Sequence, residues 1–130
     1  MIHSLTTRQR RAHRRTLRAT LRQRAAANRL VSSVRRRPRS LATVAIAAGV
    51  DKATATGTAN GLRSVAKRLG VTPAQTARTR RTVNGGRAHH THNVSRYTLG
   101  QVRTLIRSYR PRKPEYVAAV DRIARLCTAA

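Results

Sequence analysis

The side chains best suited to specific chemistry are concentrated in one stretch of the sequence, residues 72–84. Arginine makes two hydrogen bonds to guanine, and glutamine makes two to adenine, when these side chains reach the major groove of DNA. On a helix, Gln75, Arg78 and Arg81 would share one side, with further polar residues beside them. The candidate base-reading residues of this stretch are Thr72, Gln75, Thr76, Arg78, Thr79, Arg80 and Arg81.

The charge of the whole chain points to the same class of partner. Its 130 residues include 29 Lys and Arg against 3 Asp and Glu, which gives a net charge of +26. The positive charges of such a chain repel one another, and binding to a polyanion relieves that repulsion. DNA is therefore the expected partner, with RNA as an alternative. A membrane surface is disfavoured because no helical stretch has a bulky aromatic or leucine-rich face. We therefore expect a binding protein and not an enzyme.

Residues 1–39 form an arginine-rich arm. Its weakly apolar positions recur at helical spacing, at Leu17, Leu21, Ala25, Asn28, Val31 and Val34. In free solution the like charges four residues apart oppose a helix, whereas nucleic acid phosphates would relieve that repulsion. The alternative is a disordered, solubilising tail. The candidate phosphate contacts are Arg8, Arg10, Arg11, Arg14, Arg15, Arg18, Arg22, Arg35, Arg36, Arg37 and Arg39 in the arm, and Arg110, Arg112 and Lys113 near the C-terminus.

Other kinds of site have weak support. His89, His90 and His92 have no cysteine or carboxylate near them in the sequence to complete a metal site, so a solvated loop is expected. The tyrosines are interpreted as packing residues, and the single Cys127 forms no internal disulfide. We predict no catalytic residue, no metal and no cofactor. Without an apolar run long enough to span a bilayer, the expected location is cytoplasmic and nucleoid-associated.

The elements that would hold these residues are predicted to be helices. Glycines and the Asn60-Gly61 pair divide residues 40–84 into short helical segments, for which Ser40, Asp51 and Thr72 are candidate N-caps. A flexible loop is expected over 85–95. Two amphipathic helices follow within 95–127, and their apolar faces are candidates for a homodimer interface. The expected fold class is all-α, with a domain over 40–130 after the basic arm.

A compact pattern within 41–60 is typical of a helix–turn–helix. It consists of Val44, Ala45, Ala48, Gly49, Val50, Thr54 and Asn60. A small residue lets two helices approach, a glycine makes the turn, and a valine fills the angle between them. This segment resembles the helix–turn–helix of lac-repressor-type bacterial regulators. The resemblance implies DNA-facing roles for Lys52, Thr54, Thr56 and Asn60. It departs from the family at Ala55 and Thr58, where larger aliphatic residues are usual, and at Gly57, which weakens a helix.

The pattern returns twenty-one residues later, where Val65, Ala66, Leu69, Gly70 and Val71 repeat it. This second unit resembles Cro- and phage-repressor-like domains, with residues 72–84 as its recognition helix. Residues 52–69 cannot serve as recognition helix of the first unit and positioning helix of the second. We favour the second unit as the DNA reader because its helix would carry the arginines.

These observations favour a small, sequence-specific DNA-binding protein, a transcriptional regulator of bacterial, phage or plasmid type. The alternatives are a nucleoid or genome-packaging protein without base specificity, and an RNA- or ribosome-associated protein.

Overall fold

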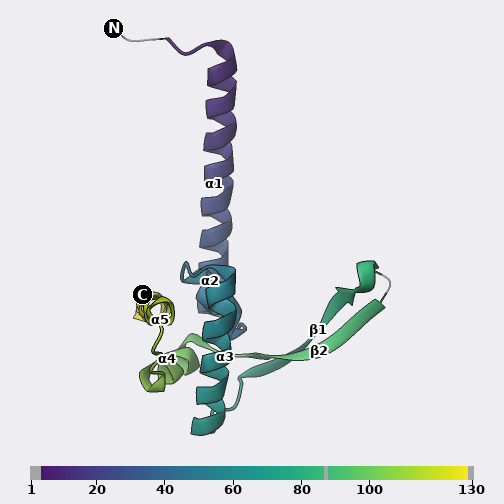
Figure 1. Ribbon diagram of the computed structural model, residues 1–130, viewed down its shortest axis with the longest axis vertical. Coiled ribbons are helices and arrows are strands. Elements are labelled where there is room, and N and C mark those ends of the chain that lie inside the picture. Colours follow the sequence, from purple (N-terminus) through teal and green to yellow (C-terminus); the bar gives the residue numbers. More distant parts are fainter. Residues whose placement is uncertain (1–3, 87, 129–130) are drawn as a thin grey trace.

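The computed structural model describes residues 4–86 and 88–128, without the side chains of 81, 83, 84, 88 and 89. A small helical body carries two projections that leave it in different directions, a long N-terminal helix and a β-hairpin (Figure 1). The elements in order are α1 (Thr7–Arg36), α2 (Leu41–Ala47), α3 (Lys52–Leu69), β1 (Gln75–Val83), the 3-10 turn η1 (Asn84–Gly86), β2 (Ala88–Arg96), α4 (Leu99–Ser108) and α5 (Pro114–Thr128).

The expected all-α fold is wrong because β1 and β2 form an antiparallel hairpin, with Gln75 opposite Arg96 and Val83 opposite Ala88. The loop expected over 85–95 is therefore mostly strand. Residues 75–83 contain β-branched side chains at 76, 79, 82 and 83, which favour a pleated strand. Gly85 and Gly86 take φ values of +64° and +91°, so they supply the left-handed backbone that a tight hairpin connection needs.

The core of the body is built from α2–α5 with small and medium-sized side chains. Leu41 and Val44 of α2, Leu62 of α3, Leu105 of α4 and Ile123 of α5 are at most 1% exposed. Alanines on α2 and α3 are fully buried beside them, which lets the helices approach closely. The apolar faces of α4 and α5 thus pack into the chain's own core, and a homodimer through these helices stays a prediction.

Helix α3 runs without a break through Asn60-Gly61, where a helix end was expected. Two tyrosine rings explain its glycines: a Cβ at Gly57 would overlap the Tyr116 hydroxyl, and a Cβ at Gly61 would lie 2.6 Å from Cζ of Tyr109. Burial raises the pKa of Tyr109, and the neighbouring Tyr116 raises it further. The helix accepts two poor helix formers because the C-terminal part of the chain packs against them.

Only the C-terminal end of α1 touches the body. Val34 is buried and Val31 packs against the core, next to α2. The helix begins with a capping box in which Thr6 and Gln9 hydrogen-bond to each other's backbone N–H. None of the described helices, α1 included, is apolar over a length that would cross a membrane.

Candidate nucleic-acid interface

Helices α2 and α3 form a helix–turn–helix. The N–H of Val50 donates to the carbonyl of Ala45 at 3.1 Å, so the chain makes a tight turn within residues 48–51. Gly49 has a φ of +95°, which strongly favours glycine at this turn. Ala45 is fully buried and Val50 is 8% exposed in the angle between the helices. The roles expected of the small residue, the glycine and the valine are therefore observed.

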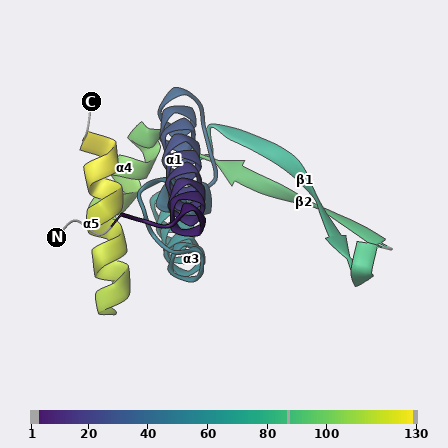
Figure 2. The ribbon, with the colours of Figure 1, turned by 90° about the horizontal axis from the view of Figure 1, so that it is seen from above.

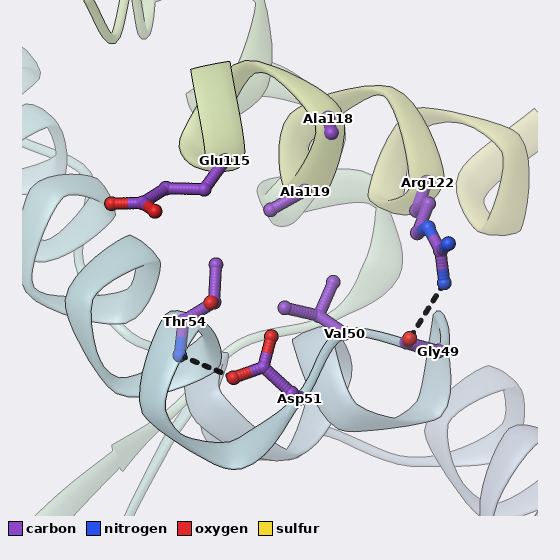
Figure 3. A pocket seen from close by; sticks show the side chains of 8 residues that line it. All are labelled: Gly49, Val50, Asp51, Thr54, Glu115, Ala118, Ala119 and Arg122. Carbon is purple, nitrogen blue, oxygen red and sulfur yellow. Dashed lines mark hydrogen bonds between the residues drawn. The ribbon is translucent and has the colours of Figure 1, made fainter. Parts of the chain in front are cut away.

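Helix α5 braces this turn from outside. The guanidinium of Arg122 donates to the carbonyl of Gly49 at 2.7 Å, across a hollow of about 310 Å³ between α5 and the start of α3 (Figure 3). In the same hollow the Asp51 carboxylate caps α3 by accepting the Thr54 N–H at 3.1 Å. Hydrogen bonds from Thr54 lower the pKa of Asp51. The start of α3 is thereby fixed relative to the rest of the body.

Five exposed residues form one line along α3: Lys52, Thr56, Asn60, Arg63 and Lys67. Their spacings of four, four, three and four residues place them on one side of a helix. Arg63 donates to the side-chain oxygen of Asn60 at 2.8 Å. We call this set the α3 stripe. It has three cations, no acid and no buried residue.

The α3 stripe contains three of the four residues implied by the lac-repressor resemblance. The fourth, Thr54, is half-buried and points toward α5 in the hollow (Figure 3). Two residues after Lys52, it belongs to the other side of the helix from the stripe. Arg63 and Lys67 were missed by the sequence reasoning because Asn60-Gly61 was interpreted as a break. Continuing the helical period from Lys52 across that pair would have found both.

The second unit is not a helix–turn–helix, so the favoured recognition helix is a wrong prediction. Helix α3 ends before Gly70, and β1 begins at Gln75. Because strand side chains alternate, Gln75 and Arg78 belong to opposite faces of the hairpin. The three residues expected on one side of a helix are therefore not brought together.

The other residues of that stretch have different places. Thr72 lies in the connection before β1, where its carbonyl accepts the side-chain amide of Gln101 at 2.7 Å. Thr76 and Arg80 share a hairpin face with Arg78, and all three are exposed. Thr79 is half-buried and its hydroxyl lies 3.1 Å from a ring nitrogen of His92. The side chain of Arg81 lies outside the described residues.

The hairpin is anchored at its base. Arg39 and Tyr97 pair as an isolated antiparallel bridge, with N–H to carbonyl distances of 3.1 and 2.9 Å. Tyr97 is also 5% exposed in the core, so the residue that follows β2 is fixed to the body. From this base the hairpin extends to the side opposite α4 and α5 (Figure 2). Nine residues per strand correspond to a reach of about 30 Å.

The candidate phosphate contacts are distributed over two regions. The arginines of the arm lie on α1 and just after it, and all except the half-buried Arg39 are exposed. Arg110, Arg112 and Lys113 are exposed in the connection between α4 and α5, where the ammonium of Lys113 lies 5.9 Å from the centre of the Tyr116 ring.

No protein-family model matches this chain, and no curated protein or solved structure matches it either. The side chain of His89 lies outside the described part of the structure; among the side chains that are described, no group of three His, Cys, Asp or Glu residues is arranged to hold a metal ion.

Proposed function

We propose that this chain is a sequence-specific DNA-binding protein, a small transcriptional regulator of bacterial, phage or plasmid type that associates with the nucleoid. The observation that carries the proposal is the α3 stripe. It is an exposed, acid-free row of donors and cations on the second helix of a helix–turn–helix, the helix that lies in the major groove in DNA-binding proteins of this design.

The centre of the stripe has the chemistry of base recognition. One N–H of the Arg63 guanidinium donates to the side-chain oxygen of Asn60, and its other N–H groups remain available to a ligand. The side-chain amide nitrogen of Asn60 can also donate to a ligand. Guanine offers two acceptors at its major-groove edge, which suits the arginine. Lys52 and Lys67 stand at the two ends of the row, where phosphates flank the groove.

The β-hairpin supplies a second contact with the same duplex. A helix–turn–helix followed by such a hairpin has the order of elements of a winged helix, so this step rests on an analogy of architecture. The analogy is supported by Arg78 and Arg80, which are exposed on one hairpin face together with hydroxyl and amide side chains. We infer that this face contacts phosphates beside the site that α3 reads.

The test is Arg63→Ala, measured on a duplex that the wild-type protein has selected from a random library. Losing a guanine contact should reduce the ratio of specific to nonspecific affinity by roughly 5- to 150-fold, corresponding to about 1–3 kcal/mol. Arg107→Ala is the matched control, because Arg107 is exposed on α4 and carries the same charge.

Three outcomes would contradict the proposal. If the library yields no preferred sequence, or both variants lose the same affinity on every duplex, the chain binds DNA through charge alone. A preference for structured RNA over any duplex would exclude DNA as the main partner.

A further inference from the structure

The first 23 residues of α1 have no partner among the described elements. Every position from 7 to 29 is exposed except the half-buried Thr20, and contact with the body begins only at Leu30 and Val31. At 1.5 Å per residue the free part is about 35 Å long. This segment is a rod that stands away from the body (Figure 1).

The arginines of this rod are confined to one side of the helix. At 100° per residue its arginines fall within an arc of about 200°, and the remaining side carries none. Those arginines are Arg8, Arg10, Arg11, Arg14, Arg15, Arg18, Arg22, Arg24 and Arg29. No acidic residue precedes Asp51 to balance them, and several are four residues apart, where like charges oppose a helix. A polyanion along this arc would remove the repulsion.

The direction of α1 determines which DNA it can reach. Helices α1 and α3 run in roughly the same direction, since both follow the long axis in Figure 1 and both are seen nearly end-on in Figure 2. The free part of α1 continues past the N-terminal end of α3. Helix α3 would lie in the major groove, which curves around the duplex. A straight helix parallel to α3 does not follow that curve, so its distance from the duplex surface increases along its length. The rod is therefore directed away from the DNA that α3 would hold.

We propose that the arginine arc of α1 is a second DNA-binding surface, which holds a different duplex segment from the one bound by α3. One chain then bridges two segments. The proposal rests on the proposed function for the position of the first duplex. The expected ligand is duplex DNA because about 35 Å of it presents roughly 20 phosphate charges, enough to face every arginine of the arc.

The test is a bridging assay with the full-length protein. An immobilised duplex of about three helical turns captures the protein, and a second labelled duplex of unrelated sequence is then added at physiological salt. The variant R11Q/R15Q/R18Q/R22Q removes four charges from the arc while keeping good helix formers. The control R68Q/R103Q/R107Q/R125Q removes four exposed charges from α3, α4 and α5, all outside the α3 stripe and outside the candidate phosphate contacts.

We expect the α1 variant to lose at least about tenfold in capture of the second duplex, while its affinity for one duplex changes by less than about threefold. The control should bridge as the wild type does. Failure of the wild type to bind any single duplex would instead contradict the proposed function.

Four results would overturn the bridging proposal. A parallel loss of single-duplex affinity with a shortened footprint would place α1 on the duplex held by α3. Equal losses of second-duplex capture in the α1 variant and the control would show that α1 acts only through the net charge of the protein. Bridging that persists in the α1 variant would show that a protein dimer makes the bridge, with each protomer holding one duplex through α3. A wild-type protein that binds one duplex but never captures a second has no bridging surface.

Discussion

At the scale of single residues, the hydroxyl of Thr58 is the least satisfied polar group that the structure describes. The residue is fully buried in α3, and its oxygen has no hydrogen-bond partner. Thr58→Val keeps the shape and removes the unpaired group, so we expect the free energy of unfolding to rise by about 1 kcal/mol. Chemical denaturation measures this.

The matched control for this substitution is Thr104→Val. Thr104 is exposed on α4 and its hydroxyl donates to the carbonyl of Gly100 at 3.2 Å, so no gain is expected there. A loss of stability in Thr58→Val would show that the buried hydroxyl has a partner in solution.

Asp51 gives a second prediction at this scale, through its cap on α3. Asp51→Ala should lower the melting temperature by a few degrees, whereas Asp51→Asn should retain most of the cap. Because the fold lowers the pKa of Asp51, the charged form stabilises the protein above the ordinary pKa of an aspartate. That contribution is lost as the pH falls through the lowered value.

Thermal melts of the wild type and Asp51→Asn at neutral pH and near pH 3 test the sign of this pH dependence. The advantage of the wild type over Asp51→Asn should shrink in acid. An advantage that grows in acid would contradict the cap as the source of the shift.

At the scale of elements, the packing of α3 against two tyrosines reverses the usual effect of replacing a helical glycine. Gly57→Ala would stabilise an exposed helix by about 1 kcal/mol. Here the new methyl group overlaps the Tyr116 hydroxyl, so we expect a loss of about 1–3 kcal/mol instead. In a Tyr116→Ala background the same substitution should become stabilising, because the obstructing ring is gone.

A double-mutant cycle measured by urea denaturation tests this coupling. Gly100→Ala on α4 is the control, since its Cβ would meet only an ordinary contact 3.8 Å away. Additive effects of Gly57→Ala and Tyr116→Ala would show that the ring does not hold α3 at this point.

Much of the helix–turn–helix could be predicted from local residues, because its causes are local. Ser40 and Asp51 cap α2 and α3 as expected, and Gly49 makes the turn between them. The length of α3 could not be predicted in the same way. Gly61 is a helix breaker by propensity, and its reason for standing inside a helix is Tyr109, 48 residues later in the sequence.

The hairpin shows why the favoured recognition helix was a wrong prediction. The stretch 75–83 has Gln75, Arg78 and Arg81 at helical spacing, but four of its nine residues are β-branched and favour a strand, so its local pattern is ambiguous. Pairing with β2 and the anchoring of Tyr97 by Arg39 favour the strand. The second of these contacts links residues 58 positions apart in the sequence. The Asn-Gly pair at 84–85 was the local signal for a hairpin connection, and it was interpreted only as a break.

At the scale of the whole molecule, the division of charge between α1 and the body predicts the salt dependence of binding. A single duplex should engage the three cations of the α3 stripe together with Arg78 and Arg80, which are exposed on the described part of the hairpin. These five contacts correspond to a slope of log affinity against log salt of about −5. R11Q/R15Q/R18Q/R22Q should leave this slope unchanged on one short duplex.

Fluorescence anisotropy across a salt series measures the slope. A much steeper slope, reduced by the α1 variant, would mean that the arm and the body hold the same duplex.

The bridge between Arg39 and Tyr97 has a further consequence for DNA topology. Arg39 lies three residues after α1 and Tyr97 lies directly between β2 and α4, so one pair of backbone hydrogen bonds joins the roots of both projections. A rotation of α1 relative to the body would therefore disturb the hairpin, and a rotation of the hairpin would disturb α1. Two duplex segments held by such a molecule would cross at a set angle and with a set handedness. A loop closed by it would therefore trap writhe of one sign.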